Sequence, residues 1–383
     1  MSTDVHIIPR ATVARLASAL PFWLSLAMVP VAWISASFGG WTLLLLPVVT
    51  WYLFAVIDFF AGLNTDNADL ETPEEDLFWY RLITLIWAPI QALMVFGILA
   101  FVTAGDHLTR LEEWLLFVVL GIVTGAIGIV YAHELMHQRN RLERWMGDLL
   151  MTMVLYGHFR SEHLLVHHRY VGTPKDPVTA RYNEGFYHYF VRVLPACLKS
   201  SFRAEQGMLA RKDRPWTDLS NPFWRYGALQ LGFLLLAVAI GGLWGLFLFV
   251  TQAFVAVAHL ELTNYIEHYG LTRKHLGGGK YEHVKPRHSW NAAHRASNWL
   301  LINLQRHSDH HYKPDRRFPL LQNYDAEEAP QLPMGYPGMG IVALIPPVWF
   351  RRMNPRVRAW RKKYYPEIED WGPYKAASNP MPR

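Results

Sequence analysis

The chain has 383 residues, of which 51% are hydrophobic, and it carries 37 Lys and Arg against 31 Asp and Glu. Cys197 is the only cysteine, which excludes an intrachain disulfide and any metal site built on Cys-x-x-Cys pairs. The mean hydropathy of +0.06 is an average over two unlike parts of the chain.

Charge and histidine are concentrated after residue 132. Residues 1–132 contain four Lys and Arg against eleven Asp and Glu, and only two of the 18 His. The remaining residues hold 33 Lys and Arg, 20 Asp and Glu, and sixteen His. We therefore interpret the first part as a membrane scaffold and the second as a basic, histidine-rich catalytic portion.

Six apolar stretches are long enough to cross a membrane, which takes about 20 mostly apolar residues in a helix. In chain order they cover approximately residues 16–38, 41–62, 78–103, 111–133, 223–241 and 243–262. The first two are joined so closely at Gly39-Gly40 that they form a helical hairpin, a pattern unlike a cleavable signal peptide. The third contains Pro89, which a spanning helix tolerates, and the last two are separated by a break near Gly241-Gly242.

A buried helix of a soluble protein explains any one of these stretches, but six in one chain predict an all-α, integral-membrane bundle of six transmembrane helices. Six passes put both chain ends on one side, together with the Lys- and Arg-rich segments 134–222 and 263–383. The positive-inside rule makes that side cytoplasmic. We therefore predict a single membrane-embedded domain over residues 1–383 with a helical, histidine-rich cytoplasmic portion.

Histidines form four clusters close to these stretches. They are HELMH at 133–137, EHLLVHH at 162–168, NYIEH at 264–268 and RHSDHH at 306–311. Residues three or four apart share one face of a helix. Three sets can therefore each direct imidazoles at one point: His133 with His137, His163 with His167, and His307 with His310 and His311. His168 can reach a neighbouring point, and His268 adds an imidazole from another helix.

Nine imidazoles on one side of a membrane are too many for one metal and fit two. Imidazole binds Fe, Zn, Cu and Ni, so the spacing leaves the metal open. Taken alone, HELMH matches the HExxH pattern of zinc proteases, with Glu134 as general base, but that interpretation needs one metal and leaves six histidines idle. A histidine-rich transporter is a weaker alternative, because the clusters lie at the membrane edge and no internal repeat is visible.

The chain resembles the bacterial alkane monooxygenases of the membrane-bound, histidine-rich desaturase and hydroxylase superfamily. The resemblance lies in five motifs, HELMHQ (133–138), EHLLVHHRYVGTPKDP (162–177), NYIEHYGL (264–271), YEHVKPRHSWNAAHRASN (281–298) and LQRHSDHH (304–311). It extends from the second apolar stretch to about Gly340. Gln138 stands where the family has Lys, and residues 164–166 are less polar than is usual in the family. Neither departure touches a proposed ligand.

The resemblance implies terminal hydroxylation of a medium-chain alkane, taken from the bilayer, to a primary alcohol with O2 and two electrons. It implies a protein of the bacterial inner membrane and a non-haem diiron centre. Its ligands would be His133, His137, His163, His167, His168, His268, His307, His310 and His311. The chemistry agrees, because a terminal C–H bond offers no handle for acid–base catalysis and needs a redox metal. A fatty-acyl desaturase or hydroxylase of the same superfamily is the alternative.

Five carboxylates near the proposed ligands are candidates for orienting the imidazoles from an outer shell. They are Glu134, Glu162, Glu267, Asp309 and Asp176. A solvated or structurally paired carboxylate is an equally good explanation for each. We expect His158, His259, His283, His288 and His294 to be surface, loop or outer-shell groups. We regard His6, His107, His188 and His275 as incidental.

An apolar channel between the spans would hold the substrate. Trp51 lies in the middle of the second apolar stretch, with Asp58 two turns nearer the cytoplasm. We hypothesise that Trp51 limits the length of the alkane chain, although an aromatic side chain packed between helices is the plainer explanation.

Electrons must come from another protein, and the resemblance implies a rubredoxin with its reductase. Rubredoxins are usually acidic, so basic side chains could steer one to the cytoplasmic face. One basic group is Arg203, Arg211, Lys212 and Arg214, and another is Arg351, Arg352, Arg356, Arg358, Arg361, Lys362 and Lys363. Attraction to anionic membrane lipid explains the second group equally well. We expect no nucleic-acid partner.

Overall fold

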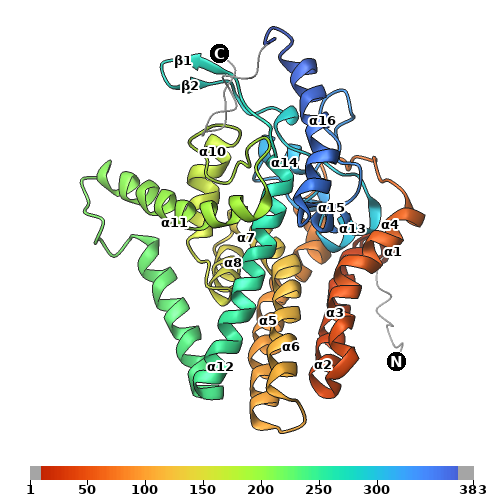
Figure 1. The fold of residues 1–383 in the computed structure, drawn as a ribbon, viewed down its shortest axis with the longest axis vertical. Helices are drawn as coiled ribbons and strands as arrows, with labels where there is room; N and C mark the ends of the chain where they lie inside the picture. Colours follow the sequence, from red (N-terminus) through yellow and green to blue (C-terminus); the bar gives the residue numbers. More distant parts are fainter. Residues whose placement is uncertain (1–9, 370–383) are drawn as a thin grey trace, which may run out of the picture.

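The computed structural model describes residues 10–369, which form a helical bundle (Figure 1). The predicted all-α class is confirmed. Within the described residues the only sheet is a two-stranded antiparallel hairpin of β1 (His275–Gly277) and β2 (Lys280–Tyr281). We predicted that both chain ends lie on one side of the membrane and that His6 is incidental. Residues 1–9 and 370–383 lie outside the described residues, so these predictions stay untested.

Five helical stretches are long and apolar enough to cross a membrane. The first, Arg15–Phe38, takes in the second half of α1 (Arg10–Ala19) and all of η1 (Leu20–Ala27) and α2 (Met28–Phe38). The second, Gly40–Ala61, comprises η2 (Gly40–Leu44), α3 (Leu45–Pro47), η3 (Val48–Leu53) and α4 (Phe54–Ala61). The others are η4 (Glu74–Leu77) with α5 (Phe78–Ala104), then α6 (Arg110–Val123), η5 (Thr124–Ile129) and α7 (Val130–His137), and finally α12 (Pro222–His268).

The predicted fifth and sixth spans lie together in α12, which has 47 residues. Gly241 and Gly242 have non-helical backbones, with φ −129° and +60° respectively, and glycine reaches positive φ without steric cost. Figure 1 shows the two arms of α12 meeting in a V at this point. The break therefore stands where the sequence predicted it, while the count of separate helices of spanning length among the described residues is five rather than six.

The helical hairpin and the proline were also predicted correctly. Gly39 joins the first two stretches with φ +58°, a backbone conformation that glycine adopts without steric cost, so the turn favours glycine at this position. Pro89 lies inside α5, which continues on both sides of it.

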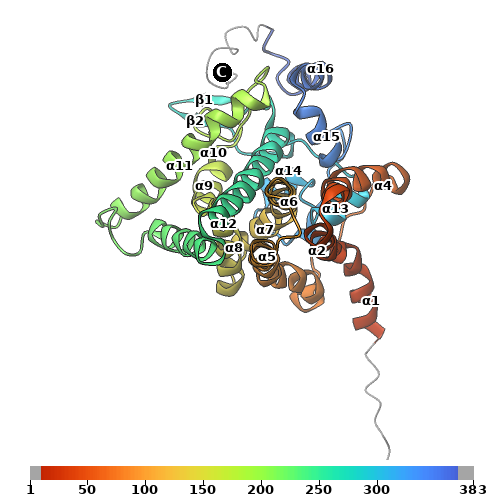
Figure 2. The same ribbon diagram turned by 60° about the horizontal axis from the view of Figure 1, so that its bottom comes forward.

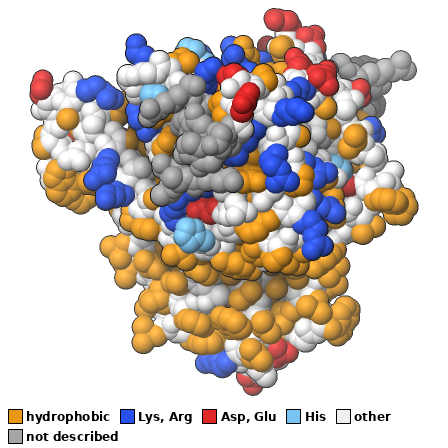
Figure 3. Space-filling model, turned by 45° about the horizontal axis from the view of Figure 1, so that its top comes forward, with side chains coloured by type: hydrophobic (Ala, Val, Ile, Leu, Met, Phe, Trp, Pro, Cys, Tyr) orange, Lys and Arg blue, Asp and Glu red, His pale blue; other side chains and the backbone are white. Residues whose placement is uncertain are grey.

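The fourth stretch forms the centre of the bundle. Of its most apolar window, 89% is buried, against 22–50% for the other four. Figure 2 shows α6 and α7 surrounded by α12, α5 and α2. In Figure 3 the hydrophobic side chains gather in a broad band over the lower part of the molecule, and most charged side chains lie above it. This distribution is that of a multi-pass membrane protein with a polar portion at one end.

The remaining helices build the polar end. They are α8 (Arg141–Met153), α9 (Phe159–Glu162), η6 (His163–His167), α10 (His168–Tyr170), α11 (Phe186–Ala210), η7 (Pro286–His288), α13 (Arg295–Leu300), α14 (His307–Tyr312), η8 (Phe318–Leu320), α15 (Tyr336–Ala343) and α16 (Pro346–Tyr364).

Asp58 of α4 connects this end to the second stretch. Its buried Oδ1 accepts hydrogen bonds from the backbone N–H groups of Ala296 and Ser297, at 2.7 and 3.0 Å, and so caps the first turn of α13.

Candidate metal centre

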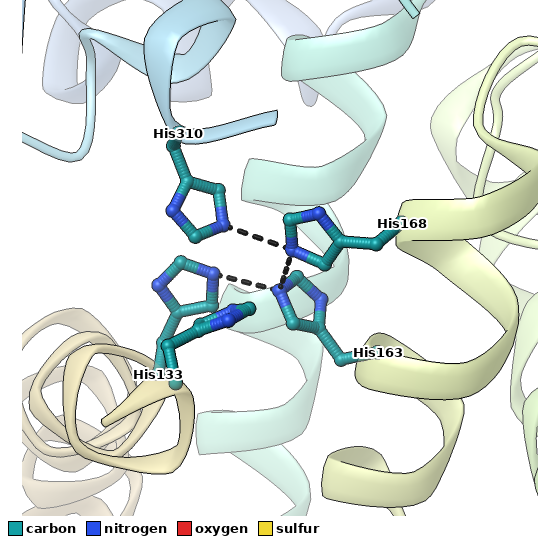
Figure 4. A group of neighbouring side chains, drawn as sticks. His133, His163, His168 and His310 are labelled. Carbon is teal, nitrogen blue, oxygen red and sulfur yellow. Dashed lines mark hydrogen bonds between the residues drawn. The ribbon is translucent and has the colours of Figure 1, made fainter. Parts of the chain in front are cut away.

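Nine histidines meet in two adjacent groups at the junction of the apolar bundle and the polar end. One group of five is His133, His137, His163, His168 and His310, and one group of four is His167, His268, His307 and His311. Within each group the candidate ligand atoms all lie within 4.8 Å of one another, and every residue is buried or half-buried. The structure thus brings together all nine histidines that the sequence singled out. Figure 4 shows rings of the five-His group turned toward one another from three separate parts of the chain.

The spacing of the ring nitrogens fits a metal ion in each group. In the five-His group, Nε2 of His163 lies 2.9 Å from Nε2 of both His133 and His168. In the four-His group, Nε2 of His307 lies 3.1 Å from Nε2 of His268 and 3.0 Å from Nε2 of His311. Two nitrogens each about 2.1 Å from one ion and at right angles to each other would be about 3.0 Å apart.

The hydrogen bonding supports the same conclusion. A neutral imidazole has one N–H donor, so Nε2 of His163 cannot satisfy two facing nitrogens at once. Nε2 of His137 and Nε2 of His167 are buried and have no hydrogen-bond partner. Buried polar atoms without a partner are costly, and a cation within each group would satisfy all of these lone pairs.

Burial makes the imidazoles suitable ligands. Burial, reinforced by the neighbouring imidazoles, holds the pKa of His163, His168 and His310 well below the usual value. The same causes lower the pKa of His307 and His311. A metal binds the neutral ring, so protons compete weakly for these nitrogens at neutral pH.

The second cluster departs from the helical pairing that the sequence predicted. We expected His163 and His167 to point at one metal, whereas His163 pairs with His168 in the five-His group and His167 joins the four-His group. The cause is the π-helical turn η6, in which the backbone N–H of His168 donates to the carbonyl of His163. Hydrogen bonds from i+5 to i bring residues five apart onto one face of the helix.

The fourth cluster also divides between the two groups. His307 and His311, four residues apart on α14, point into the four-His group, and His310 points into the five-His group. One short helix therefore contributes to both groups. The His133 and His137 pair stays together in full as the sequence predicted, and His307 and His311 stay together without His310.

Asp176 is the one proposed outer-shell carboxylate that contacts the outer ring nitrogen of a candidate ligand, His167. Oδ2 of Asp176 lies 3.0 Å from Nδ1 of His167, and Thr179 donates to the same oxygen. Glu134 instead accepts from the Phe318 backbone and from Gln138, and Asp309 pairs with Arg316.

The other two carboxylates are buried among the ligand-bearing segments. Both oxygens of Glu162 lack a hydrogen-bond partner, and burial, with Asp176 and Glu261 nearby, raises the pKa of Glu162 well above its usual value. Glu267 lies against His307.

The histidines left out of the ligand set lie outside both groups, as far as the described residues extend. His259 accepts a hydrogen bond from Trp51, His288 lies against Glu282, His188 pairs with Glu184, and His107 contacts a backbone carbonyl. His275 is in β1. His158, His283 and His294 bring no ring nitrogen into either group.

Two apolar cavities lie side by side between the membrane portion and the histidines, and we refer to them together as the apolar path. The outer cavity is lined by Trp51, His259 and Tyr336, among others. The inner cavity is lined by His133, His163 and His307, and both have Val130 and Thr263 in their walls.

Sequence reasoning missed His259 and Tyr336 as parts of this path. His259 could have been found, because an ionisable residue inside an apolar helix is usually functional. Tyr336 comes from α15, and no local signal connects it to the path.

Adjacent residues on α14 provide a test of the two groups. We expect His310→Ala to reduce bound metal by up to one ion per chain from the five-His group, and His311→Ala to do the same from the four-His group. The double variant should lose both ions. Elemental analysis of protein purified in detergent without chelator measures the content, with His188→Ala, in the exposed part of α11, as control. Complete loss of metal in either single variant would contradict two separate sites.

Comparison with known proteins agrees with the motifs and the geometry. Residues 112–343 match the fatty acid desaturase family. The chain is 38% identical over 360 residues to alkane 1-monooxygenase 2 of Pseudomonas aeruginosa, covering 91% of this chain and 90% of that protein. It is 35% identical to the alkane 1-monooxygenase of Acinetobacter baylyi over 81% of this chain and 76% of that protein. The xylene/toluene monooxygenase hydroxylase component of Pseudomonas putida is 30% identical over 64% of each chain. The chain therefore belongs to the fatty acid desaturase family and, within it, to the bacterial alkane monooxygenases.

Proposed function

We propose that this protein hydroxylates the terminal carbon of medium-chain alkanes to primary alcohols, using O2, two electrons and two irons held by the nine histidines. The observation that carries the proposal is the position of two all-imidazole groups at the inner end of an apolar path that begins in the membrane portion. An alkane has neither a polar group to recognise nor an acidic proton, so shape and a redox metal are what its oxidation requires.

The residues have separate tasks in this proposal. The five-His and four-His groups hold the two irons, which would supply the redox chemistry that attacks an unactivated C–H bond. Asp176 fixes the ring of His167 through Nδ1 and so keeps Nε2 available as a ligand. Apolar side chains of the inner cavity, including Phe159, Leu260 and Leu304, exclude water and hold the end of the chain beside the ligands.

The geometry gives less support to the alternatives. In an HExxH protease the glutamate would act on a water at the metal, but the carboxylate of Glu134 hydrogen-bonds to the Phe318 backbone and to Gln138. A desaturase would use the same kind of centre but yield an alkene. The xylene/toluene monooxygenase relative makes xylene and toluene a second class of substrate to assay.

The position in the cell follows from charge. Six passes, with the arms of α12 as the last two, would place the histidine-bearing end and both chain ends on one side. That end carries the excess of Lys and Arg, so we assign it to the cytoplasmic side of a bacterial inner membrane.

A rubredoxin, reduced by its own reductase, is the proposed electron donor. Its docking surface would be a basic hollow between α11 and the loop that follows α10, lined by Lys175, Arg181, Arg192, Lys199 and Arg203. Asp176 is also in its wall and connects the hollow to His167. In the C-terminal basic group, Arg361 is buried against the ring of Tyr182 and Lys363 pairs with Glu327. The other five side chains of that group are exposed, so it is a second candidate surface.

The direct test is turnover by the purified protein. We expect a chain with close to two irons to convert an alkane and O2 to the primary alcohol when reduced rubredoxin and its reductase are supplied. Gas chromatography of the products separates a primary alcohol from an alkene, which would indicate a desaturase. One zinc per chain with no iron would overturn the proposal in favour of the protease.

Trp51 should set the length of the substrate. Its indole N–H donates to Nε2 of His259 at 3.0 Å, and the two rings stack with centroids 5.9 Å apart, so they bound the outer cavity. We expect Trp51→Ser to shift the products of an alkane mixture toward longer chains. Trp41→Ser, on an exposed side chain, is the control, and an unchanged product distribution in Trp51→Ser would contradict the role.

Electron transfer should depend on the basic hollow. We expect Lys199→Gln with Arg203→Gln to raise the KM for reduced rubredoxin about tenfold at low salt, because charge steering is lost, while kcat at saturating donor stays the same. Stopped-flow oxidation of rubredoxin at several salt concentrations measures both. Arg139→Gln with Arg141→Gln, at two exposed residues that belong neither to the hollow nor to the two basic groups, is the control. A rate indifferent to salt in the parent protein would exclude steering.

A further inference from the structure

Glu267 is a buried carboxylate whose contacts the proposed function has not yet accounted for. It precedes His268 on α12, is 2% exposed, and lines the inner cavity together with His133 of the five-His group and His307 of the four-His group. Its Oε1 has no hydrogen-bond partner. Its Oε2 lies 3.3 Å from Nε2 of His307.

The atom that Glu267 faces determines what it can do. Nε2 of His307 is the nitrogen directed at its group, since it lies 3.1 and 3.0 Å from Nε2 of His268 and His311. An imidazole nitrogen that binds a metal carries no proton, so it cannot donate to Glu267. A carboxylate oxygen and a nitrogen lone pair at this distance repel each other unless both contact a cation.

Asp176 shows the contrasting arrangement. Its carboxylate lies at Nδ1 of His167, the ring nitrogen on the far side from the group, while Nε2 of that ring is left without a partner. That is how an outer-shell carboxylate orients a ligand. Glu267 meets its histidine on the opposite nitrogen, so it does not match the orienting role that its sequence position suggested.

The two groups also differ in the number of ring nitrogens they offer, five against four. We propose that Glu267 is a carboxylate ligand of the metal in the four-His group, binding on the side of the inner cavity that faces the five-His group. The proposal rests on the proposed function, because it requires that both groups bind metal. The carboxylate is not part of the set of atoms that all lie within 4.8 Å of one another, so it would bind the metal from the edge of the four-nitrogen group.

Neighbouring groups favour this position. The buried hydroxyl of Tyr336 on α15 donates to the backbone carbonyl of Trp290 at 3.3 Å, and it lies close enough to the Glu267 carboxyl to interact with it electrostatically. The two metals would then have unlike ligands, five neutral imidazoles on one and four imidazoles with an anionic oxygen on the other. Oxygen ligands favour harder, more highly charged ions, so the metal beside Glu267 would be the easier of the two to oxidise.

The test uses the full chain in detergent, loaded with the Mössbauer isotope of iron and studied reduced and without O2. We expect the parent protein to show two different quadrupole doublets. In Glu267→Gln one doublet should change while the other stays, and the affected iron should pass to a chelator at least about tenfold faster. Glu267→Asp, which keeps the carboxylate, should retain both irons.

Glu261→Gln is the matched control, because Glu261 is a fully buried carboxylate on the same helix that bonds to Tyr156 and Tyr189 instead of a histidine. It should leave both doublets unchanged. If the parent chain does not hold two irons, the proposed function itself fails. If the parent holds two and Glu267→Gln gives the parent spectrum and chelation rate, only the ligand assignment fails. A change of both doublets in equal measure in Glu267→Gln would overturn it as well.

Discussion

Nine imidazoles share one buried space and face one another through their lone-pair nitrogens. In the five-His group, Nε2 of His163 lies 2.9 Å from Nε2 of His133 and 2.9 Å from Nε2 of His168. A neutral His163 ring has one N–H and cannot form hydrogen bonds to both of these nitrogens through the same atom. Without a cation such a site would carry unpaired polar atoms at a cost of about 1–3 kcal/mol each. Bound metal would therefore also have a structural role, because it would join α7, η6 with α10, α12 and α14, four parts of the chain that are far apart in the sequence.

Several π-helical turns lie along the path from the membrane portion to the histidines. The turn η3 carries Trp51, η5 contributes Ala126 and Ile129 to the cavity walls, and η6 carries His163. A π-turn inserts one residue into a helix and rotates the residues after it about the helix axis, which is why such turns are frequent at functional sites. Here they let long apolar helices keep their packing and still direct particular side chains into the path.

The C-terminal arm of α12 combines the two halves of the proposed function. His259 meets Trp51 in the outer cavity, Thr263 borders both cavities, and His268 belongs to the four-His group. His268 follows His259 by nine positions on the helix, which is a rise of about 14 Å. A rod-shaped substrate lying along this arm would have one end at the indole and the other at the metals, so a single rigid element would fix the distance between length selection and chemistry.

The sequence by itself determined the local properties of this protein. Apolar composition located the membrane stretches, two glycines located the break in α12, and residue type identified the nine histidines, because each of these depends on a few neighbouring residues. The tertiary structure decided how the histidines divide into five and four. That division depends on whether a turn such as η6 is α or π, and on which helices meet, as His310 meets His168 across 142 residues. The tertiary structure also decided that Asp176 contacts the outer nitrogen of the His167 ring, whereas Glu267 contacts the inner nitrogen of the His307 ring. A position next to a histidine in the sequence does not set these contacts, because the direction of a buried carboxylate depends on how distant segments pack.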